Sequence, residues 1–376
     1  DVEQRNLQNN IVGLEASRLF ARSEINMGVD AFRDSLYAML KRNTFLNIKF
    51  ENMLDTLGEM SRTDLYSYLK EWEQLTPLPF YSIGEPELTK VVNKGGEEFF
   101  VLKVLVSNNS DYDGIIQMNV LQNGWWYQPM EDPRARKKVE IAAHTSKEFV
   151  SVWEEQIRDV EINTMVSGNL PYMIRQSIGN VKQERNKIVK DTIYTLPESS
   201  LEMPGEVIVD NEDSTLFVLS TPAVVGLLPK WLDKVEDTSF KYSGISWWRA
   251  PLQWTATTNA KYYGKYIRSA YVIKSGDGSQ TATWKIPVPE AGQYELYYHV
   301  FKDDELRWND RLQGEYHFRV AYDSEMEDAY INLRKANEGW EQLGTYYFSA
   351  DTVRVVLTDE CKLRSVTADA VKIVKR

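Results

Sequence analysis

The end of the chain, residues 339–374, carries the sequence pattern that decides the fold. It consists of Gly339-Trp340-Glu341-Gln342-Leu343-Gly344-Thr345-Tyr346-Tyr347-Phe348, then Val353–Leu357, then Val366-Thr367-Ala368-Asp369-Ala370-Val371-Lys372-Ile373-Val374. The three runs are short and rich in β-branched and aromatic residues, and polar turns separate them. The pattern predicts three β-strands of a sheet that closes a domain.

Apolar residues also alternate with other residues before this stretch, which predicts further strands. These strands are expected at Gln280–Val288, Gln293–Val300 and Glu315–Tyr322. In the second of them, Tyr294, Leu296, Tyr298 and Val300 would form the apolar face, with His299 on the opposite face.

The motifs of this region resemble those of the C-terminal carbohydrate-binding-like module found in golvesin and xanthan lyase. That module ends in a W-x-x-L-G-x-Y-x-F run, a valine-rich strand and an A-D-A-V strand, and all three occur here in this order. The resemblance extends back to about residue 204, where Val207–Asn211 matches the opening strand. It implies a β-sandwich over residues 201–376 that binds polysaccharide or cell-surface glycan without catalysis.

The middle of the chain, residues 80–200, shows the same two-residue period. Alternating apolar residues begin at Phe100, Ile116 and Val139, and another run surrounds Phe149. Spaced strands with polar turns predict a small antiparallel β-sandwich. The polar, mixed-charge end of this region, residues 180–200, is interpreted as a linker or a short solvated helix.

The first 79 residues show a helical pattern instead. Val29, Phe32, Leu36 and Leu40 recur at intervals of three and four, which places them on one helix face. The run Gly28–Leu36 and the later Asp64-Leu65 resemble packing motifs of the helical C-terminal part of gluzincin metallopeptidases, the aminopeptidase N clan. The overall prediction is multidomain α plus all-β: an N-terminal helical segment (1–79) followed by two antiparallel β-sandwich domains (80–200 with the linker, and 201–376).

The gluzincin zinc motif is missing from this chain. That family holds its zinc with H-E-x-x-H, whereas the three histidines here, His144, His299 and His317, lie outside any such motif. The sequence also has no G-x-S-x-G elbow and no P-loop. We therefore expect no enzyme activity, no catalytic residues, no bound metal and no cofactor.

Composition limits the possible partners and the compartment. The net charge is −11, from 44 basic and 55 acidic residues, which argues against nucleic-acid binding. The single cysteine rules out an internal disulfide, and no apolar run reaches the roughly 18 residues of a membrane span. Because the chain begins at Asp1 without a signal sequence, either a segment was removed during maturation or the chain is a piece of a longer protein. We favour the second interpretation and expect an exported bacterial protein.

Five aromatic residues lie within seventeen positions and are the candidate binding residues: Trp247, Trp248, Trp254, Tyr262 and Tyr263. Sugars stack their C–H faces on aromatic rings, so these residues would form a glycan platform. The favoured alternative is that they fill the edge of the sandwich or pack against the neighbouring domain, because adjacent residues on a strand face opposite sides.

Other chemically capable residues give weaker signals. The acidic clusters 303–305 and 323–328 lack the spacing of a calcium-binding loop, and solvated turns are the better interpretation. His299 and His317 are interpreted as structural histidines. Asp369 is interpreted as a hydrogen-bonding residue at the end of a strand.

The sequence thus gives a ranked set of functions. The first is a non-catalytic C-terminal region of an exported metallopeptidase-like protein with a carbohydrate- or surface-binding module. The second is a purely architectural region that packs on a catalytic part and binds no ligand. The third, an independent glycan-active enzyme, ranks last because no catalytic set is recognisable.

Overall fold

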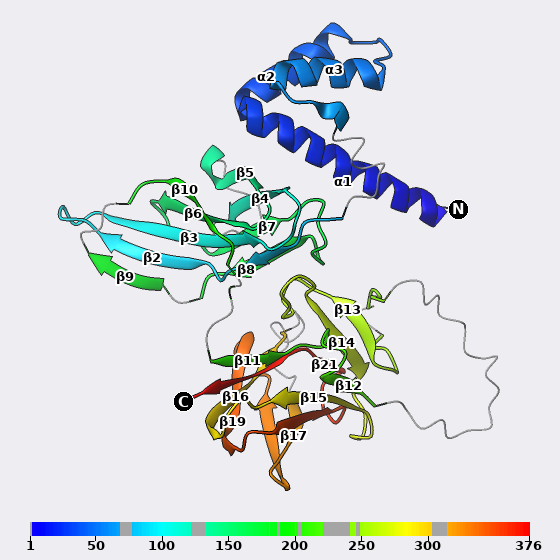
Figure 1. Cartoon of the computed structure of the whole chain (residues 1–376), viewed down its shortest axis with the longest axis vertical. Helices are drawn as coiled ribbons and strands as arrows, with labels where there is room; N and C mark the ends of the chain where they lie inside the picture. The colour runs from blue at the N-terminus through cyan, green and yellow to red at the C-terminus, as the bar shows by residue number, and fades with distance from the viewer. Residues whose placement is uncertain are drawn as a thin grey trace. The chain divides into compact units, whose positions relative to one another are not determined.

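The computed structural model describes most of the chain, with side chains from residue 12 onward. The described residues are 2–67, 77–121, 132–179, 181–185, 189–199, 201, 205–220, 241–245, 249–302 and 314–376. The chain divides into two compact units, residues 1–201 and 202–376. Each unit has its own hydrophobic core, and its elements are labelled in Figure 1.

The first unit begins with the helices α1 (Val2–Met27), α2 (Val29–Arg42) and α3 (Phe50–Ser61). Gly28 separates α1 from α2 with a φ of 85°, a conformation that glycine adopts without steric cost. Phe32, Leu54 and Leu57 are buried in the small core of these helices. Val29, expected on the same buried face as Phe32, is 56% exposed instead, because this core covers only part of α2.

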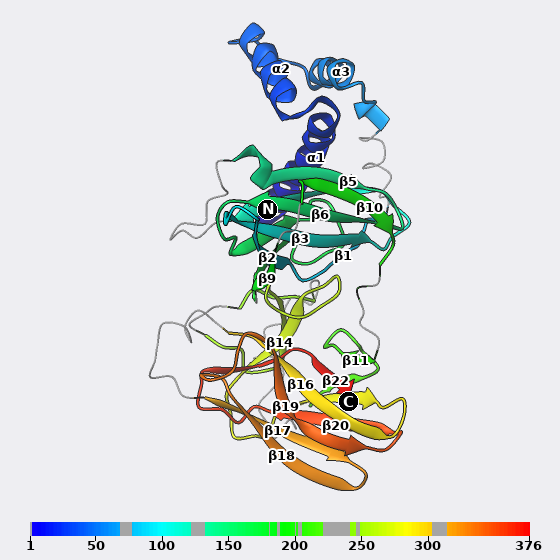
Figure 2. The same cartoon turned by 90° about the vertical axis from the view of Figure 1, so that its left-hand side faces the viewer.

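Helix α1 is built into the β-structure of its unit rather than forming a separate segment. Ala21 and Ile25 pack against Ile115 and Met165 of the β-structure. Arg22 pairs with Glu140, and Lys138 pairs with Glu24. Figure 1 shows α1 running beside β4 and β5, and Figure 2 shows it next to β5. No helix in the described part of the chain is long and apolar enough to cross a membrane.

The larger sheet of the first unit has six strands in the order β10-β6-β3-β2-β9, with β1 paired to β3. Its strands are β1 (Tyr81–Ile83), β2 (Glu87–Val92), β3 (Glu98–Asn108), β6 (Thr145–Trp153), β9 (Val181–Arg185) and β10 (Thr192–Pro197). The pair β2/β9 is parallel, whereas the other pairs are antiparallel.

A four-stranded antiparallel sheet, in the order β5-β4-β7-β8, completes this unit. Its strands are β4 (Gly114–Leu121), β5 (Arg136–Ile141), β7 (Asp159–Asn163) and β8 (Met173–Ser177), and the short helix η1 (Pro133–Ala135) precedes β5. One buried cluster joins both sheets, with Val104 and Phe149 from the six-stranded sheet and Ile116 and Val160 from the four-stranded one.

The polar stretch 180–200 was expected to be a linker or a short helix, and this prediction is wrong. It contains β9, which pairs with β2, and β10, which pairs with β6. Most side chains of β9 and β10 are exposed. Both strands lie at the edges of the sheet, where polar residues are tolerated and the two-residue apolar signal is lost.

The second unit contains three sheets in its described part, of four, five and three strands. The four-stranded sheet, in the order β11-β22-β16-β19, consists of β11 (Glu206–Val209), β22 (Val371–Lys375), β16 (Gly292–Val300) and β19 (Gly339–Phe348). The five-stranded sheet, in the order β12-β15-β20-β17-β18, consists of β12 (Phe217–Leu219), β15 (Thr281–Pro287), β20 (Thr352–Thr358), β17 (Glu315–Tyr322) and β18 (Glu325–Asn332). The three-stranded sheet consists of β13 (Thr255–Thr258), β14 (Ser269–Lys274) and β21 (Ser365–Ala368).

The strands expected in the C-terminal region are confirmed. Gln280–Val288, Gln293–Val300 and Glu315–Tyr322 correspond to β15, β16 and β17. The alternation is also correct, because Tyr294, Leu296, Tyr298 and Val300 are buried while His299 is only half-buried. Part of the acidic cluster 323–328 forms the two-residue turn between β17 and β18, where Asp323 and Ser324 have φ values of 43° and 72°.

The predicted fold class, a helical segment followed by two antiparallel β-sandwich domains, is wrong. The protein is mostly β, with 47% of residues in strands and 16% in helices. Its described strands form five separate sheets, two in the first unit and three in the second, whereas two sandwiches would contain four. The parallel pair β2/β9 also excludes a purely antiparallel first unit. Alternating apolar residues reveal a strand and its buried face, but they do not determine which strands share a sheet.

One exposed histidine gives the first unit a predicted pH dependence. His144 Nε2 lies 2.7 Å from Asp111 Oδ1, and Nδ1 lies 2.8 Å from Glu198 Oε2. The hydrogen bonds to Glu198 and Asp111 raise the pKa of His144 above its ordinary value. The stabilisation is therefore fully present below about pH 6.5, the ordinary imidazole pKa, and is lost as pH rises through the raised pKa of the folded state.

We expect His144→Gln to lower the Tm at pH 6 and to have little effect at high pH. Thermal unfolding of both proteins between pH 5.5 and 9 measures this difference. Because all three side chains are exposed, 0.5 M salt should reduce the effect at pH 6. A Tm difference that grows with pH would contradict the assignment.

Candidate functional site

The chain changes sheet at Asp369, and this change positions the candidate site. The run 366–374 was expected to be one strand, but it forms β21 in the three-stranded sheet and β22 in the four-stranded sheet. Asp369 lies between these two strands and is fully buried. Its carbonyl oxygen accepts a hydrogen bond from Trp284 Nε1 at 3.1 Å, which fixes the corner against the core.

The Asp369 carboxylate holds the imidazole of His299. Nδ1 of His299, on β16, lies 2.8 Å from Asp369 Oδ2. A carboxylate only accepts hydrogen bonds, so the imidazole donates through Nδ1 and its Nε2 remains available to another group. The backbone N–H of Tyr263 also donates to both carboxylate oxygens, at 3.1 and 3.2 Å. The imidazole therefore has a fixed orientation, and its Nε2 has no hydrogen-bond partner among the described residues.

Two aromatic rings flank this imidazole. The ring centroid of Trp340, which lies opposite His299 on β19, is 5.1 Å from that of His299. The centroid of Tyr263 lies 5.8 Å from that of His299 and 5.0 Å from that of Trp340. The side chain of His299 is 12% exposed, and both aromatic residues are half-buried. We call Tyr263, His299 and Trp340, with Asp369 beneath them, the aromatic–histidine site.

A lysine adjoins the same site. The Lys372 ammonium lies 4.9 Å from the Trp340 ring centroid, a cation–π distance, and 3.0 Å from Glu206 Oε1. Its side chain is only 12% exposed. The edge of the site thus carries a positive charge that is already paired.

Burial governs the charge of the carboxylates behind the site. Burial raises the pKa of Asp369, and the His299 imidazole opposes this rise. Burial also raises the pKa of Asp210 well above its usual range, and repulsion from Asp369 adds to this shift. The negative charge at this corner is therefore tolerable mainly because His299 and backbone N–H groups face Asp369.

The structure separates the five candidate aromatic residues. Trp247 and Trp248 lie outside the described residues. Trp254 is half-buried and packs against the core, and Tyr262 is 5% exposed and packs against Phe301. Tyr263 is the candidate that the structure places in the aromatic–histidine site.

The sequence reasoning missed the partners of Tyr263. His299 and Asp369 were interpreted as structural residues, and Trp340 was treated only as part of a motif. Hydrogen bonding by Asp369 at the end of a strand is confirmed. The sequence contained a signal that these residues belong to the site, because Trp340 and Asp369 both lie in motifs that carry the family resemblance.

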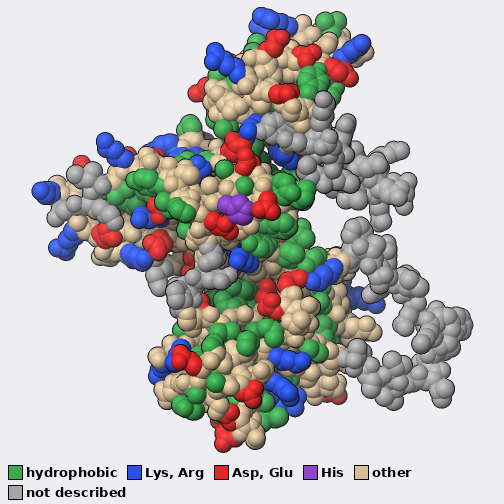
Figure 3. All heavy atoms as spheres, viewed as in Figure 1, with side chains coloured by type: hydrophobic (Ala, Val, Ile, Leu, Met, Phe, Trp, Pro, Cys, Tyr) green, Lys and Arg blue, Asp and Glu red, His purple; other side chains and the backbone are tan. Residues whose placement is uncertain are grey.

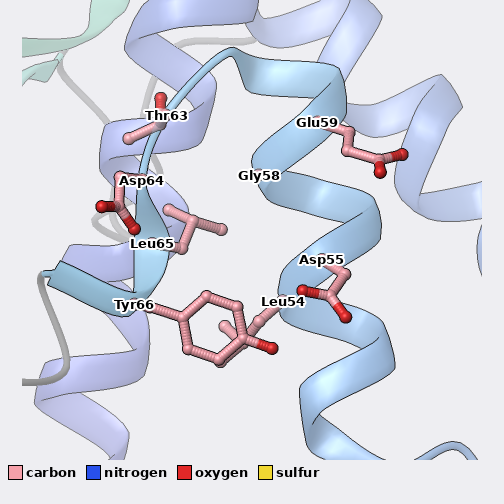
Figure 4. Close-up of a pocket in the computed structure, with 8 residues that line it drawn as sticks. All are labelled: Leu54, Asp55, Gly58, Glu59, Thr63, Asp64, Leu65 and Tyr66. Carbon is pink, nitrogen blue, oxygen red and sulfur yellow. The ribbon is translucent and has the colours of Figure 1, made fainter.

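Other parts of the described structure are weaker candidates for a ligand or metal site. No three His, Cys, Asp or Glu side chains of the described residues are grouped to hold a metal ion. Figure 4 shows a hollow at the end of α3, with Tyr66 lying across it toward Leu54 and Asp55. Its volume is about 190 Å³, below the range of about 300–1,000 Å³ typical of ligand pockets.

Comparison with known families supports the C-terminal assignment. The model of the Golvesin C-terminal domain matches residues 247–375. This confirms the resemblance of the C-terminal module over that range, which starts later than residue 204. The range includes all four residues of the aromatic–histidine site. The comparisons do not support the gluzincin resemblance of the helical segment.

A search of curated proteins found no match. Among solved structures, β-glucuronidase 2 of Bacteroides uniformis is 10% identical over 84% of this chain, with a TM-score of 0.21. This chain covers 32% of that protein's length. Sulfolobus turreted icosahedral virus gives a chain that is also 10% identical, covering 80% of this chain and 93% of that chain, with a TM-score of 0.16. At such TM-scores, neither likeness carries an argument about function.

Proposed function

We propose that the C-terminal unit is a non-catalytic carbohydrate-binding module and that Tyr263, His299 and Trp340 make the contact. The observation that carries this proposal is the His299 imidazole, fixed by buried Asp369 between two aromatic rings. Aromatic rings pack against the C–H faces of sugars, and a fixed polar group orients their hydroxyls. The match to the Golvesin C-terminal domain supports a carbohydrate-binding-like module in this range.

The proposal includes no chemical step. An imidazole held by a carboxylate also occurs in hydrolases, but such sites add a nucleophile within hydrogen-bond reach of the free nitrogen. Here Nε2 of His299 has no hydrogen-bond partner in the described part of the chain. We therefore assign His299 to ligand binding, where its free nitrogen would bond to a sugar hydroxyl.

The wider setting of the module stays a prediction. We propose that the chain is part of an exported protein, since Golvesin-type domains occur in secreted proteins. A metallopeptidase parent rests only on the sequence resemblance of residues 1–79. An H-E-x-x-H motif in the upstream reading frame would support that parent.

Replacing Trp340 tests the binding function. We expect the full chain to bind on an array of neutral glycans and Trp340→Ala to lose about 1–3 kcal/mol of binding, the scale of an aromatic anchor. The matched control is Tyr347→Ala, which removes a 60% exposed ring from the same strand outside the site. Circular dichroism checks that both variants fold.

The alternative function predicts another outcome. If the unit is purely architectural, the wild-type chain will retain no glycan, and Trp340→Ala will alter only stability. Equal binding losses in Trp340→Ala and Tyr347→Ala would also contradict the assigned site.

A further inference from the structure

The outward face of the five-stranded sheet carries an unusual set of charges. Strand alternation places Lys285 of β15, Arg354 of β20 and Arg319 of β17 on the side opposite the core. Their strands are neighbours about 4.8 Å apart. Lys285 lies directly opposite Arg354, whereas Arg319 lies opposite Val356, two residues from Arg354 along β20. We call these three residues the cationic row.

The cationic row has no acidic ion-pair partner in the described part of the chain. None of the three side chains forms an ion pair with any residue that the structure describes. Elsewhere on the protein, basic and acidic side chains often adjoin, as several places in Figure 3 show.

Two details show that the row does not serve stability. Lys285 and Arg354 lie directly opposite each other across the β15/β20 ladder. Like charges in this position repel and destabilise a sheet. The Nε of Arg319 is also buried without a hydrogen-bond partner in the described structure, an arrangement that disfavours folding. An anion on this face would relieve the repulsion between Lys285 and Arg354.

An exposed aromatic ring lies at the end of the row. Tyr330 of the edge strand β18 is 58% exposed and stacks on His317 at 4.9 Å, with 9° between the ring planes. Asp328, which lies opposite Arg319 in the ladder, is 2.7 Å from His317 Nε2. In the described part of the chain Asp328 forms an ion pair with His317 and none with Arg319, and the exposed Tyr330 ring can stack on a ligand.

We propose that this face binds a uronic-acid polysaccharide, with the cationic row holding its carboxylates and Tyr330 stacking on a sugar ring. Arginine forms two parallel hydrogen bonds to a carboxylate, and lysine adds charge. The carboxylates would neutralise the repulsion between Lys285 and Arg354. The choice of a polysaccharide among polyanions rests on the proposed function, whereas the charge of the ligand follows from the row itself.

Retention of polygalacturonate by the full chain tests this inference in affinity electrophoresis at low salt. We expect wild type to bind polygalacturonate and Lys285→Gln/Arg354→Gln to bind at least tenfold more weakly. The matched control is Lys335→Gln/Arg334→Gln, which removes the same charge from the exposed turn after β18 and should change binding less than twofold. Tyr330→Ala should weaken binding while leaving the charge unchanged.

Several outcomes would overturn the inference. The inference fails if the wild type does not bind polygalacturonate, or if the two double variants lose the same amount of binding. It also fails if the wild type binds dextran sulfate or single-stranded DNA more strongly than polygalacturonate. The Lys285→Gln/Arg354→Gln variant removes a repulsive pair and should fold, and Lys285→Arg should retain binding. Polygalacturonate binding that Trp340→Ala leaves intact supports the cationic row even if neutral glycans fail to bind. If Trp340→Ala loses polygalacturonate binding and Lys285→Gln/Arg354→Gln does not, the polymer binds at the aromatic–histidine site instead.

Discussion

Replacement of Asp369 by alanine is expected to destabilise the C-terminal unit by about 3–5 kcal/mol, the scale for removing one partner of a buried pair. Asp369 is fully buried and accepts hydrogen bonds from His299 and from the backbone N–H of Tyr263. Alanine would leave both donors without their acceptor at a buried corner. Urea denaturation, followed by near-ultraviolet circular dichroism, measures the loss.

The matched variant is Asp369→Asn, which keeps the volume and the oxygen that accepts from Tyr263. It should destabilise the unit less than alanine does. A loss of unfolding free energy under about 1 kcal/mol in Asp369→Ala is typical of surface substitutions. Such a small loss would contradict the role of Asp369 as the buried acceptor that positions His299 and Tyr263.

Replacement of Trp284 by alanine is the second large effect, and we expect about 3–5 kcal/mol of destabilisation. Trp284 is fully buried on β15, with its ring centroid 5.3 Å from that of Phe217 and 6.0 Å from that of Tyr298. Its removal would create a cavity in the largest core cluster and delete the hydrogen bond to the Asp369 carbonyl.

Trp254→Ala provides the comparison within the same unit. Trp254 is half-buried, and its Nε1 has no hydrogen-bond partner in the described residues, so its loss should be smaller. Denaturation of the two variants under the same conditions measures the difference. Equal losses of unfolding free energy in the two variants would contradict the larger stabilising role assigned to the fully buried Trp284.

Part of this architecture could be predicted from the sequence. The strands β15, β16 and β17 follow from alternation, because each has one buried face and one face that is mostly half-buried. The edge strands β9 and β10 could not be found in this way, since most of their side chains are exposed. The grouping of strands into five sheets depends on pairing between distant segments, which local alternation does not encode.

The candidate site illustrates the same limit. Tyr263 was identified because aromatic residues cluster around it in the sequence. His299 and Asp369 are 70 residues apart, and the sequence alone does not place them in contact. Their contact arises because the chain changes sheet between β21 and β22, within a run that appears in the sequence as one strand.

The imidazole of His299 offers the most direct test of the central claim that the aromatic–histidine site binds carbohydrate. The chain has three histidines, so histidine-labelled protein gives three sets of imidazole NMR signals that single His→Gln variants assign. The probe is the neutral oligosaccharide that binds best on the glycan array. The account predicts that its addition shifts the His299 signals and leaves those of His144 and His317 in place. Binding of this oligosaccharide without any shift at His299 would contradict it.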